Sequence, residues 1–89
     1  MVKIYIILVY DVDHERVNKI CNFLKCYLNW IQNSVFEGEI TESNLEKIKI
    51  ELKKLISSND SIIIFEILNQ KSIKKEIIGK EKQNITRII

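Results

Sequence analysis

The sequence predicts a small α+β domain in which two helices pack on one face of a β-sheet. Runs of β-branched and aromatic residues at 2–10 and 61–68 are typical of strands, and apolar residues recur at helical spacing in residues 13–28 and 43–56. The length of 89 residues suits one domain spanning residues 1–89. With 46% hydrophobic residues, no proline and two glycines, the chain is neither disordered nor of low complexity.

The first predicted strand, residues 2–10, is apolar almost throughout, which is typical of a strand covered on both faces. Successive side chains of a strand point to opposite faces. One face of this strand carries Ile4, Ile6, Leu8 and Tyr10, and the other carries Tyr5, Ile7 and Val9. The strand ends at Asp11, and Asp13 is placed to cap the helix that follows.

A single apolar stripe predicts the first helix, and it consists of Val17, Ile20, Cys21, Leu24 and Leu28. Cys21 and Cys26 belong to neither a Cys-x-x-Cys motif nor a Cys/His cluster, so we expect buried or half-buried thiols rather than a metal site. The next segment, residues 30–40, is predicted to be the second strand. Gly38 is expected to mark a bulge or a bend in it.

The second helix is predicted to begin at Ser43, because Ser43 and Glu46 have the spacing of a capping box. Its apolar stripe consists of Leu45, Ile48, Leu52, Leu55 and Ile56. Its lysines are expected around the outside, at Lys47, Lys49, Lys53 and Lys54. The polar residues 57–60 then end the helical pattern.

Three further strands are expected in the carboxyl part of the chain. Residues 61–68 form the third strand, and Asn69–Gln70 form a turn. Residues 71–78 give a more polar fourth strand that ends at Gly79, and residues 84–89 give a short fifth.

The elements therefore run β-α-β-α-β-β with one more strand appended. This order lies nearest to a ferredoxin-like β-α-β-β-α-β sandwich, provided that residues 31–40 and 62–68 pair with the two sides of the first strand. Two helices cover one face of such a sheet and leave the face of Tyr5, Ile7 and Val9 open. Because so large an apolar patch is unusual on a soluble monomer, we expect a twofold homodimer with its sheets face to face.

Charge is distributed unevenly along the chain. Residues 1–45 hold four basic and six acidic groups, and residues 46–89 hold ten basic and six acidic groups. A basic carboxyl half is compatible with contacts to a phosphate backbone, and also with an ordinary solvated surface. No apolar run reaches the roughly 18 residues of a membrane span, and residues 2–10 lack a signal cleavage site, so we expect no membrane segment and a cytoplasmic location.

Asp11 is the principal candidate for chemistry, because it is a carboxylate at the end of a buried strand; a turn-forming or capping role is the alternative. Protein sites for Mg²⁺ combine one or two carboxylates with waters and phosphate oxygens. A twofold dimer would bring two copies of Asp11 to one such cation, which suits phosphodiester hydrolysis. Asp13 and Glu15 are candidates to support this site, and His14 is a candidate base.

Other catalytic templates are absent from the sequence, which has no P-loop, no dinucleotide-binding glycine motif, no nucleophile elbow and no HExxH zinc motif. The aromatic residues Tyr10, Trp30 and Phe36 have the chemistry to stack on bases. Packing in the core or in a dimer interface is the better explanation of these three residues.

Four strings in the sequence carry a family resemblance. They are Val9-Tyr10-Asp11-Val12, Arg16-x-x-Lys19, Leu24-x-x-Tyr27-Leu28 and Ile31-Gln32-Asn33-Ser34-Val35-Phe36-Glu37-Gly38. They resemble the CRISPR-associated protein two family, and the resemblance runs across nearly the whole chain. It implies a ferredoxin-like homodimer with its sheets face to face, and a carboxyl-terminal strand at about residues 80–89 that packs on the partner subunit.

The resemblance also implies roles for single residues. The metal-binding Asp of the family falls on Asp11 and its neighbouring aromatic residue on Tyr10. The basic residue of the family's first helix falls on Arg16, and Phe36 matches the aromatic residue of the second strand, where it serves packing or the dimer. Trp30 stands where members often carry an arginine, and this departure removes one phosphate contact.

Two roles follow from the resemblance. In the first, which we favour, the dimer is a scaffold that bridges subunits of the CRISPR-associated integrase during spacer acquisition. In the second, it is an endonuclease for single-stranded RNA or for DNA that uses Mg²⁺ or another divalent cation at the catalytic Asp11 of both chains. The residues expected to contact nucleic acid in either role are Tyr10, Arg16, Lys19, Lys74, Lys75, Lys80 and Lys82. The alternatives are a scaffold without chemistry and a ferredoxin-like regulatory domain that binds a small molecule.

Overall fold

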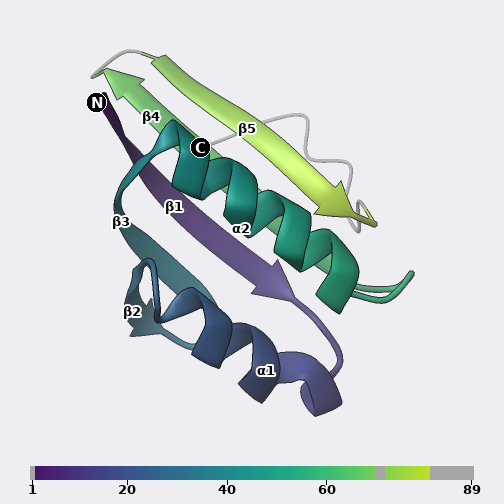
Figure 1. Ribbon diagram of the computed structural model, residues 1–89. Coiled ribbons are helices and arrows are strands. Elements are labelled where there is room, and N and C mark those ends of the chain that lie inside the picture. Colours follow the sequence, from purple (N-terminus) through teal and green to yellow (C-terminus); the bar gives the residue numbers. More distant parts are fainter. Residues whose placement is uncertain (1, 70–71, 81–89) are drawn as a thin grey trace.

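The computed structural model describes residues 2–69 and 72–80. Its elements follow in the order β1 (Lys3–Asp11), α1 (His14–Leu24), β2 (Asn29–Gln32), β3 (Val35–Thr41), α2 (Glu42–Leu55), β4 (Ser61–Asn69) and β5 (Ser72–Gly79). The strands form one antiparallel sheet in the order β2-β3-β1-β4-β5, and both helices lie on the same face of it (Figure 1). The predicted class, a small α+β domain with two helices on one side of a sheet, is therefore confirmed.

The core lies between the helices and the sheet, and β1 runs through its centre. Ile6 and Leu8 of β1 are fully buried there, and Tyr10 is 3% exposed. Helices and neighbouring strands complete this core with Ile20, Leu24, Phe36, Ile40, Leu45, Ile48, Leu52, Ile62, Ile64 and Ile78. The alternation predicted for β1 is confirmed, because the intervening Tyr5, Ile7 and Val9 are less buried and face away from the helices.

The prediction of one strand over residues 30–40 is wrong, because this segment is the hairpin of β2 and β3. The chain turns at Asn33, whose φ of 46° lies in the left-handed region that asparagine tolerates. The observed order is therefore β-α-β-β-α-β-β. The irregular pairing lies in β2 between Trp30 and Gln32 and not at Gly38, which pairs regularly with Ile6.

Gly38 serves close packing instead. A Cβ atom at this position would lie 3.3 Å from Cδ2 of Leu28, a buried side chain on the segment between α1 and β2. Leu28 was predicted to extend the stripe of the first helix, but α1 ends at Leu24. Cys21 is half-buried as expected, whereas Cys26 lies beyond the helix and is exposed.

The start of α2 also differs from the prediction. The helix begins at Glu42, and the Thr41 hydroxyl accepts a hydrogen bond from the Asn44 N–H at 3.2 Å. Thr41 is thus the N-cap, and the expected capping box at Ser43 does not form. Asp13 does precede α1 as its N-cap residue, but its carboxylate makes no cap hydrogen bond.

The two strands predicted at 61–68 and 71–78 are confirmed as β4 and β5, and Gly79 ends β5 with a φ of 93°. Asn69 is part of β4 rather than of a turn. The predicted strand at 84–89, the packing of residues 80–89 on a partner, Gln70 and Lys82 fall outside the described part of the chain. In that described part, none of the helices is long and apolar enough to span a membrane.

Candidate functional site

Asp11 is the last residue of β1, at the end of the central strand nearest the start of α1 (Figure 1). It is exposed and lies opposite Ser61, the first residue of β4. Val12 and Asp13 connect it to α1. A carboxylate at this position is anchored on one side by strand pairing, and its geometry depends on how the short connection to α1 is held.

That connection is held by Asp60, a residue in the loop between α2 and β4 whose side chain is 1% exposed. Its Oδ1 accepts hydrogen bonds from the Asp13 N–H at 3.2 Å and from Arg16 Nη2 at 3.0 Å. Its Oδ2 accepts from Arg16 Nε at 2.6 Å and from the Ser57 N–H at 2.8 Å. Both oxygens are therefore fully used, and Asp60 joins the loop before β4 to the turn after β1.

Arg16 completes this cluster from the first turn of α1. Besides Asp60, its guanidinium contacts the carboxylates of Asp13 at 3.1 Å and of Glu15 at 2.9 Å. The hydrogen bonds from Arg16 outweigh the effect of burial and lower the pKa of Asp60 from 3.8 to about 2. The same hydrogen bonds from the guanidinium to Asp60 raise the pKa of Arg16. The pair is consequently ionised throughout the ordinary pH range.

Sequence reasoning missed Asp60, because it treated residues 57–60 only as a polar break after the second helix. The expected contact of Arg16 with nucleic acid stays a prediction, and its guanidinium contacts three carboxylates of its own chain. The partners Arg16 and Asp60 lie 44 positions apart. One signal was present in the sequence, because an arginine that follows Asp13 and Glu15 closely is expected to pair with them. That signal does not reveal the third carboxylate, Asp60.

A second ion-pair cluster surrounds Lys49 of α2. Lys49 is 9% exposed, so its expected place on the outside of the helix is wrong. Its Nζ lies 2.7 Å from Glu76 in β5, 3.6 Å from Glu46 in α2 and 4.0 Å from Glu66 in β4. Burial acts to lower the pKa of Lys49, but the carboxylates outweigh it and raise the pKa, while the hydrogen bond from Lys49 lowers the pKa of Glu76.

Within residues 2–69 and 72–80, Asp11 is not part of a ready-made group of metal ligands. Among the residues that the structure describes, no three His, Cys, Asp or Glu side chains come together as a ligand group. Asp13 and Glu15 lie close in sequence but contact Arg16, and His14 is exposed at the start of α1. The carboxylate of Asp11 is of the oxygen type that Mg²⁺ prefers. A second Asp11 from another copy of the chain would bring the number of carboxylates to two, which suits such a cation.

The aromatic candidates separate into buried and exposed residues. Tyr10 and Phe36 are buried in the core, with ring centroids 6.2 Å apart, and burial raises the pKa of Tyr10. Phe36 is 0% exposed and so packs within its own chain. Trp30, for which we expected packing in the core or a dimer, is 54% exposed in β2, with Lys25 Nζ 5.6 Å from its ring centroid.

The candidate lysines that the structure describes do not form one surface. Lys19 on α1, Lys74 on β5 and Lys80 after β5 are exposed. Lys74 and Lys75 are neighbours in a strand and therefore point to opposite faces of the sheet. Lys74 pairs in register with Glu66 on the helix side, whereas Lys75 pairs with Phe65 on the other side. Exposed lysines of α2 add Lys47, Lys53 and Lys54.

The sheet has an open face, which is the face away from the helices. On this face, strand pairing places twelve side chains of β3, β1, β4 and β5 in three rows. The rows are Glu39-Tyr5-Ile67-Ile73, Glu37-Ile7-Phe65-Lys75 and Val35-Val9-Ile63-Ile77. Nine of these twelve residues are apolar or aromatic. Tyr5 Oη donates a hydrogen bond to Glu37 within the face, and this bond raises the pKa of Tyr5.

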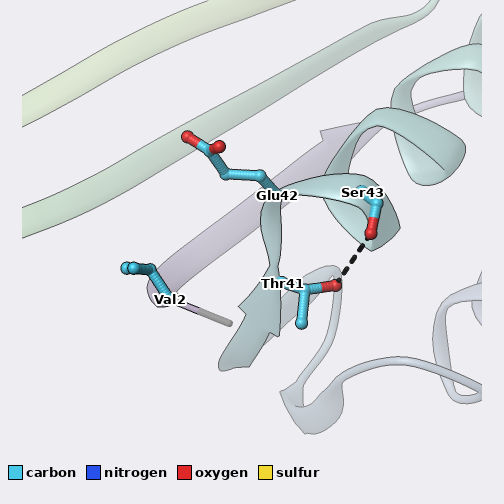
Figure 2. A pocket seen from close by; sticks show the side chains of 4 residues that line it. All are labelled: Val2, Thr41, Glu42 and Ser43. Carbon is cyan, nitrogen blue, oxygen red and sulfur yellow. Dashed lines mark hydrogen bonds between the residues drawn. The ribbon is translucent and has the colours of Figure 1, made fainter.

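A hollow at the opposite end of β1 from Asp11 is lined by Val2, Thr41, Glu42 and Ser43 (Figure 2). It lies at the start of α2, and the Thr41 and Ser43 hydroxyls are 3.4 Å apart there. Thr41 already accepts the cap hydrogen bond of the helix. The hollow therefore adds nothing to the chemistry at Asp11.

These features define a class of small α+β proteins that combine one antiparallel sheet, two helices on one face and an acidic residue at the end of the central strand. The model of a known family, described as CRISPR associated protein Cas2, matches residues 4–76. The chain belongs to this Cas2 family, which confirms the resemblance seen in the sequence.

Individual relatives agree with this assignment. A Pyrococcus furiosus protein named CRISPR-associated endoribonuclease Cas2 is 51% identical over 86 residues, covering 96% of this chain and 99% of the relative. A protein of the same name from Methanocaldococcus jannaschii is 49% identical over 96% of this chain and 75% of the relative.

A solved structure described as the crystal structure of Cas2 matches with a TM-score of 0.74 at 38% identity, over 99% of this chain and 100% of that one. Streptococcus pyogenes Cas2 matches with a TM-score of 0.66 at 28% identity, over 75% and 88% of the two chains.

Proposed function

We propose that this protein is a cytoplasmic CRISPR adaptation protein, which acts as a homodimer, binds nucleic acid and bridges integrase subunits during spacer acquisition. We further propose that the dimer hydrolyses phosphodiesters, with single-stranded RNA as the first substrate to test and DNA as the second. The names of the Pyrococcus furiosus and Methanocaldococcus jannaschii relatives, both endoribonucleases, support RNA. The observation that carries the proposal is the exposed Asp11 at the end of the central strand.

The open face supports the homodimer. Each chain is proposed to be a ferredoxin-like β-α-β-β-α-β unit with β5 appended, and the nine apolar or aromatic side chains of its open face need a cover. A second copy supplies a matching surface through a twofold axis. The charges on this face favour one orientation, in which β3 lies over β5 of the partner. Glu37 and Glu39 would then face Lys75, whereas β3 over β3 would oppose carboxylates.

Asp11 from both chains is proposed to hold Mg²⁺ or another divalent cation. Two carboxylates with waters and substrate oxygens make a suitable donor set for this ion. When bound, such a cation lowers the pKa of a coordinated water and offsets the charge of the reacting phosphate. The task of Asp11 is to bind and orient the cation from a fixed strand end.

The basic residues divide between two tasks in this proposal. Lys19, Lys74 and Lys80 are exposed and are proposed to contact phosphates, together with the lysines of α2. Lys75 lies on the open face and is assigned to the subunit interface. Charge reversal of Lys74 and Lys80 should weaken duplex binding and flatten its dependence on salt, and an unchanged salt slope would reject that surface.

A scaffold without chemistry is the second candidate. It is favoured by the single carboxylate that each chain offers at the proposed site, since the described residues hold no group of three ligands. Asp11→Asn separates the two roles. We expect this variant to lose Mg²⁺-dependent RNA cleavage and to keep spacer acquisition, measured in cells with a repeat array and the integrase. Unchanged cleavage by Asp11→Asn would reject the active site, and lost acquisition by a folded dimer would count against a scaffold independent of Asp11.

The dimer has its own test. Sedimentation equilibrium should show a dimer for the full chain, and Lys75→Glu should weaken it. Combining Lys75→Glu with Glu37→Lys should restore part of the affinity if β3 faces the partner's β5. The matched control is Lys74→Glu, the same change one residue away on the other face of the sheet. A monomeric full chain at micromolar concentration would reject the proposal.

A further inference from the structure

We infer that Asp60 and Arg16 are positioning residues for Asp11, which set the turn after β1 and thereby the place of the proposed cation-binding carboxylate. This inference rests on the proposed function, because it assigns a task beside the site that Asp11 is proposed to form. The sequence had pointed to Arg16 only as a nucleic-acid contact and had not pointed to Asp60. Its basis is the connectivity of the hydrogen bonds around Asp60.

Asp60 holds two main-chain segments next to Asp11, the turn after β1 and the start of β4. In the turn, the Asp60 carboxylate binds the Asp13 N–H at 3.2 Å, two residues beyond Asp11. At the start of β4, Asp60 directly precedes Ser61, which lies opposite Asp11 in the pairing of β1 and β4. The loop that carries Asp60 is itself closed by hydrogen bonds in both directions between Asp60 and Ser57. A shift of Asp60 therefore moves the segments on which Asp11 depends.

Arg16 fixes the orientation of the Asp60 carboxylate. Its Nε and Nη2 contact the two oxygens of Asp60 at 2.6 and 3.0 Å, which is the two-point geometry of a guanidinium on a carboxylate. The Arg16 N–H also donates to the Asp13 carbonyl at 2.9 Å. The turn of Val12 and Asp13 is thus held by one side chain from the loop before β4 and by one residue of α1.

Neither residue is available as a ligand for the cation or the substrate in this arrangement. Each Asp60 oxygen already accepts two hydrogen bonds, and the side chain is 1% exposed. Arg16 is paired with three carboxylates. Their effect on Asp11 is therefore indirect, and partners that orient metal ligands typically contribute about 10- to 100-fold in metal affinity or activity.

The experiment compares Asp60→Asn, Arg16→Gln and Arg16→Lys in the full chain with Glu76→Gln. Glu76→Gln is the matched control, because it removes a carboxylate from the other buried ion-pair cluster and leaves the turn after β1 untouched. Mn²⁺ affinity is measured by paramagnetic broadening of the amide signals of residues 10–13, without substrate. RNA cleavage is measured separately, with kcat and KM resolved, at a temperature well below each variant's melting temperature.

We expect Asp60→Asn and Arg16→Gln to weaken Mn²⁺ binding about 10-fold and to lower kcat about 10- to 100-fold with little change in KM. Arg16→Lys should lie between Arg16→Gln and the unaltered chain, because lysine keeps the charge but loses the two-point contact. Glu76→Gln should keep both values. A purely structural role would lower the melting temperature of all these variants and leave Mn²⁺ affinity and kcat of the folded protein unchanged.

The outcomes separate this inference from the proposed function. If the unaltered chain binds Mn²⁺ but does not cleave RNA or DNA, and Asp60→Asn weakens the binding, the hydrolase proposal fails and the positioning role stands. If the unaltered chain cleaves and Asp60→Asn and Arg16→Gln keep its Mn²⁺ affinity and kcat, the positioning role is overturned. A raised KM with unchanged kcat in Arg16→Gln would assign Arg16 to phosphate contact and also overturn it. No Mn²⁺ binding by the unaltered dimer overturns both.

Discussion

The two ion-pair clusters described above, around Asp60 and around Lys49, use their buried charges differently. Asp60 accepts two of its four hydrogen bonds from main-chain amides, at Asp13 and Ser57. The ion pairs of Lys49 in the described residues join it to side chains on α2, β4 and β5. A buried charge that binds the main chain determines how a loop is shaped, whereas one that binds side chains joins elements that strand pairing and apolar packing already hold. The two clusters should therefore respond differently to mutation.

Asp60→Ala is expected to have the largest effect. It removes the acceptor of two main-chain amides and leaves Arg16 without its closest partner, so we expect a loss of about 3 kcal/mol in the free energy of unfolding. Urea unfolding followed by circular dichroism measures this loss. A loss no greater than that of Lys49→Met would remove the distinction between the two clusters.

Gly79→Ala is expected to disturb the same cluster from the end of β5. Gly79 has a φ of 93°, and a Cβ atom there would collide with the main-chain oxygen of Asp60, which accepts a hydrogen bond from the Lys80 N–H. Backbone strain and this collision should together cost about 2 kcal/mol. Thermal unfolding measures the cost. Gly38→Ala is the control and should cost less, because its Cβ would meet the flexible end of the Leu28 side chain.

Acid should weaken the Asp60 cluster as the pH falls below about 4. The pKa of Asp60 is lowered from 3.8 to about 2 in the folded chain, mainly by hydrogen bonds from Arg16. The unfolded chain therefore binds this proton at higher pH, so the stability from Asp60 is complete above pH 4 and is lost as the pH falls toward 2. We expect this contribution to the free energy of unfolding to be about 2 kcal/mol. Urea unfolding at a series of pH values should show that the free energy of unfolding depends less on pH between 4 and 2 in Asp60→Asn than in the unaltered chain. An equal dependence on pH would contradict the assignment to Asp60.

Lys49→Met is expected to have the smallest effect. Methionine fills much of the volume of the lysine stem, but removing one partner of a buried ion pair leaves the other charge uncompensated, which is destabilising. The loss is limited because two of the three carboxylates, Glu46 and Glu76, are 66% and 34% exposed and can be hydrated, so we expect a net loss of about 1 kcal/mol at neutral pH. Urea unfolding at pH 7 measures it. The pKa of Glu76, followed by NMR, should rise from its lowered value at the same time, because Lys49 is the main cause of the lowering.

Most of the fold could be predicted from the sequence, because its strongest signals are local. The apolar run of β1 and the stripe of α2 each lie within one element. The hairpin of β2 and β3 was not predicted, because its turn at Asn33 and Ser34 contains neither glycine nor proline and the flanking residues read as one continuous strand. Asparagine in the left-handed region was the physical signal that this reading overlooked.

The candidate site was predicted only in part. Asp11 could be singled out because the end of an apolar strand is visible in the sequence. Asp60 could not, because its importance comes from partners that the fold brings to it from the turn after β1, from α1 and from the residue after β5. The same limit applies to Lys49, whose helix position suggested solvent until strands β4 and β5 supplied its carboxylates.

The central place of β1 has a consequence for how the molecule forms. β1 precedes both of its neighbours in the chain, and its second neighbour, β4, begins only at Ser61. During translation, one hydrogen-bonding edge of β1 therefore stays unpaired until most of the chain has been made. Sheets assembled from such distant segments form slowly compared with local structure. Newly made chains pass through a stage in which a long apolar edge is open to any other strand, and successful folding competes there with aggregation.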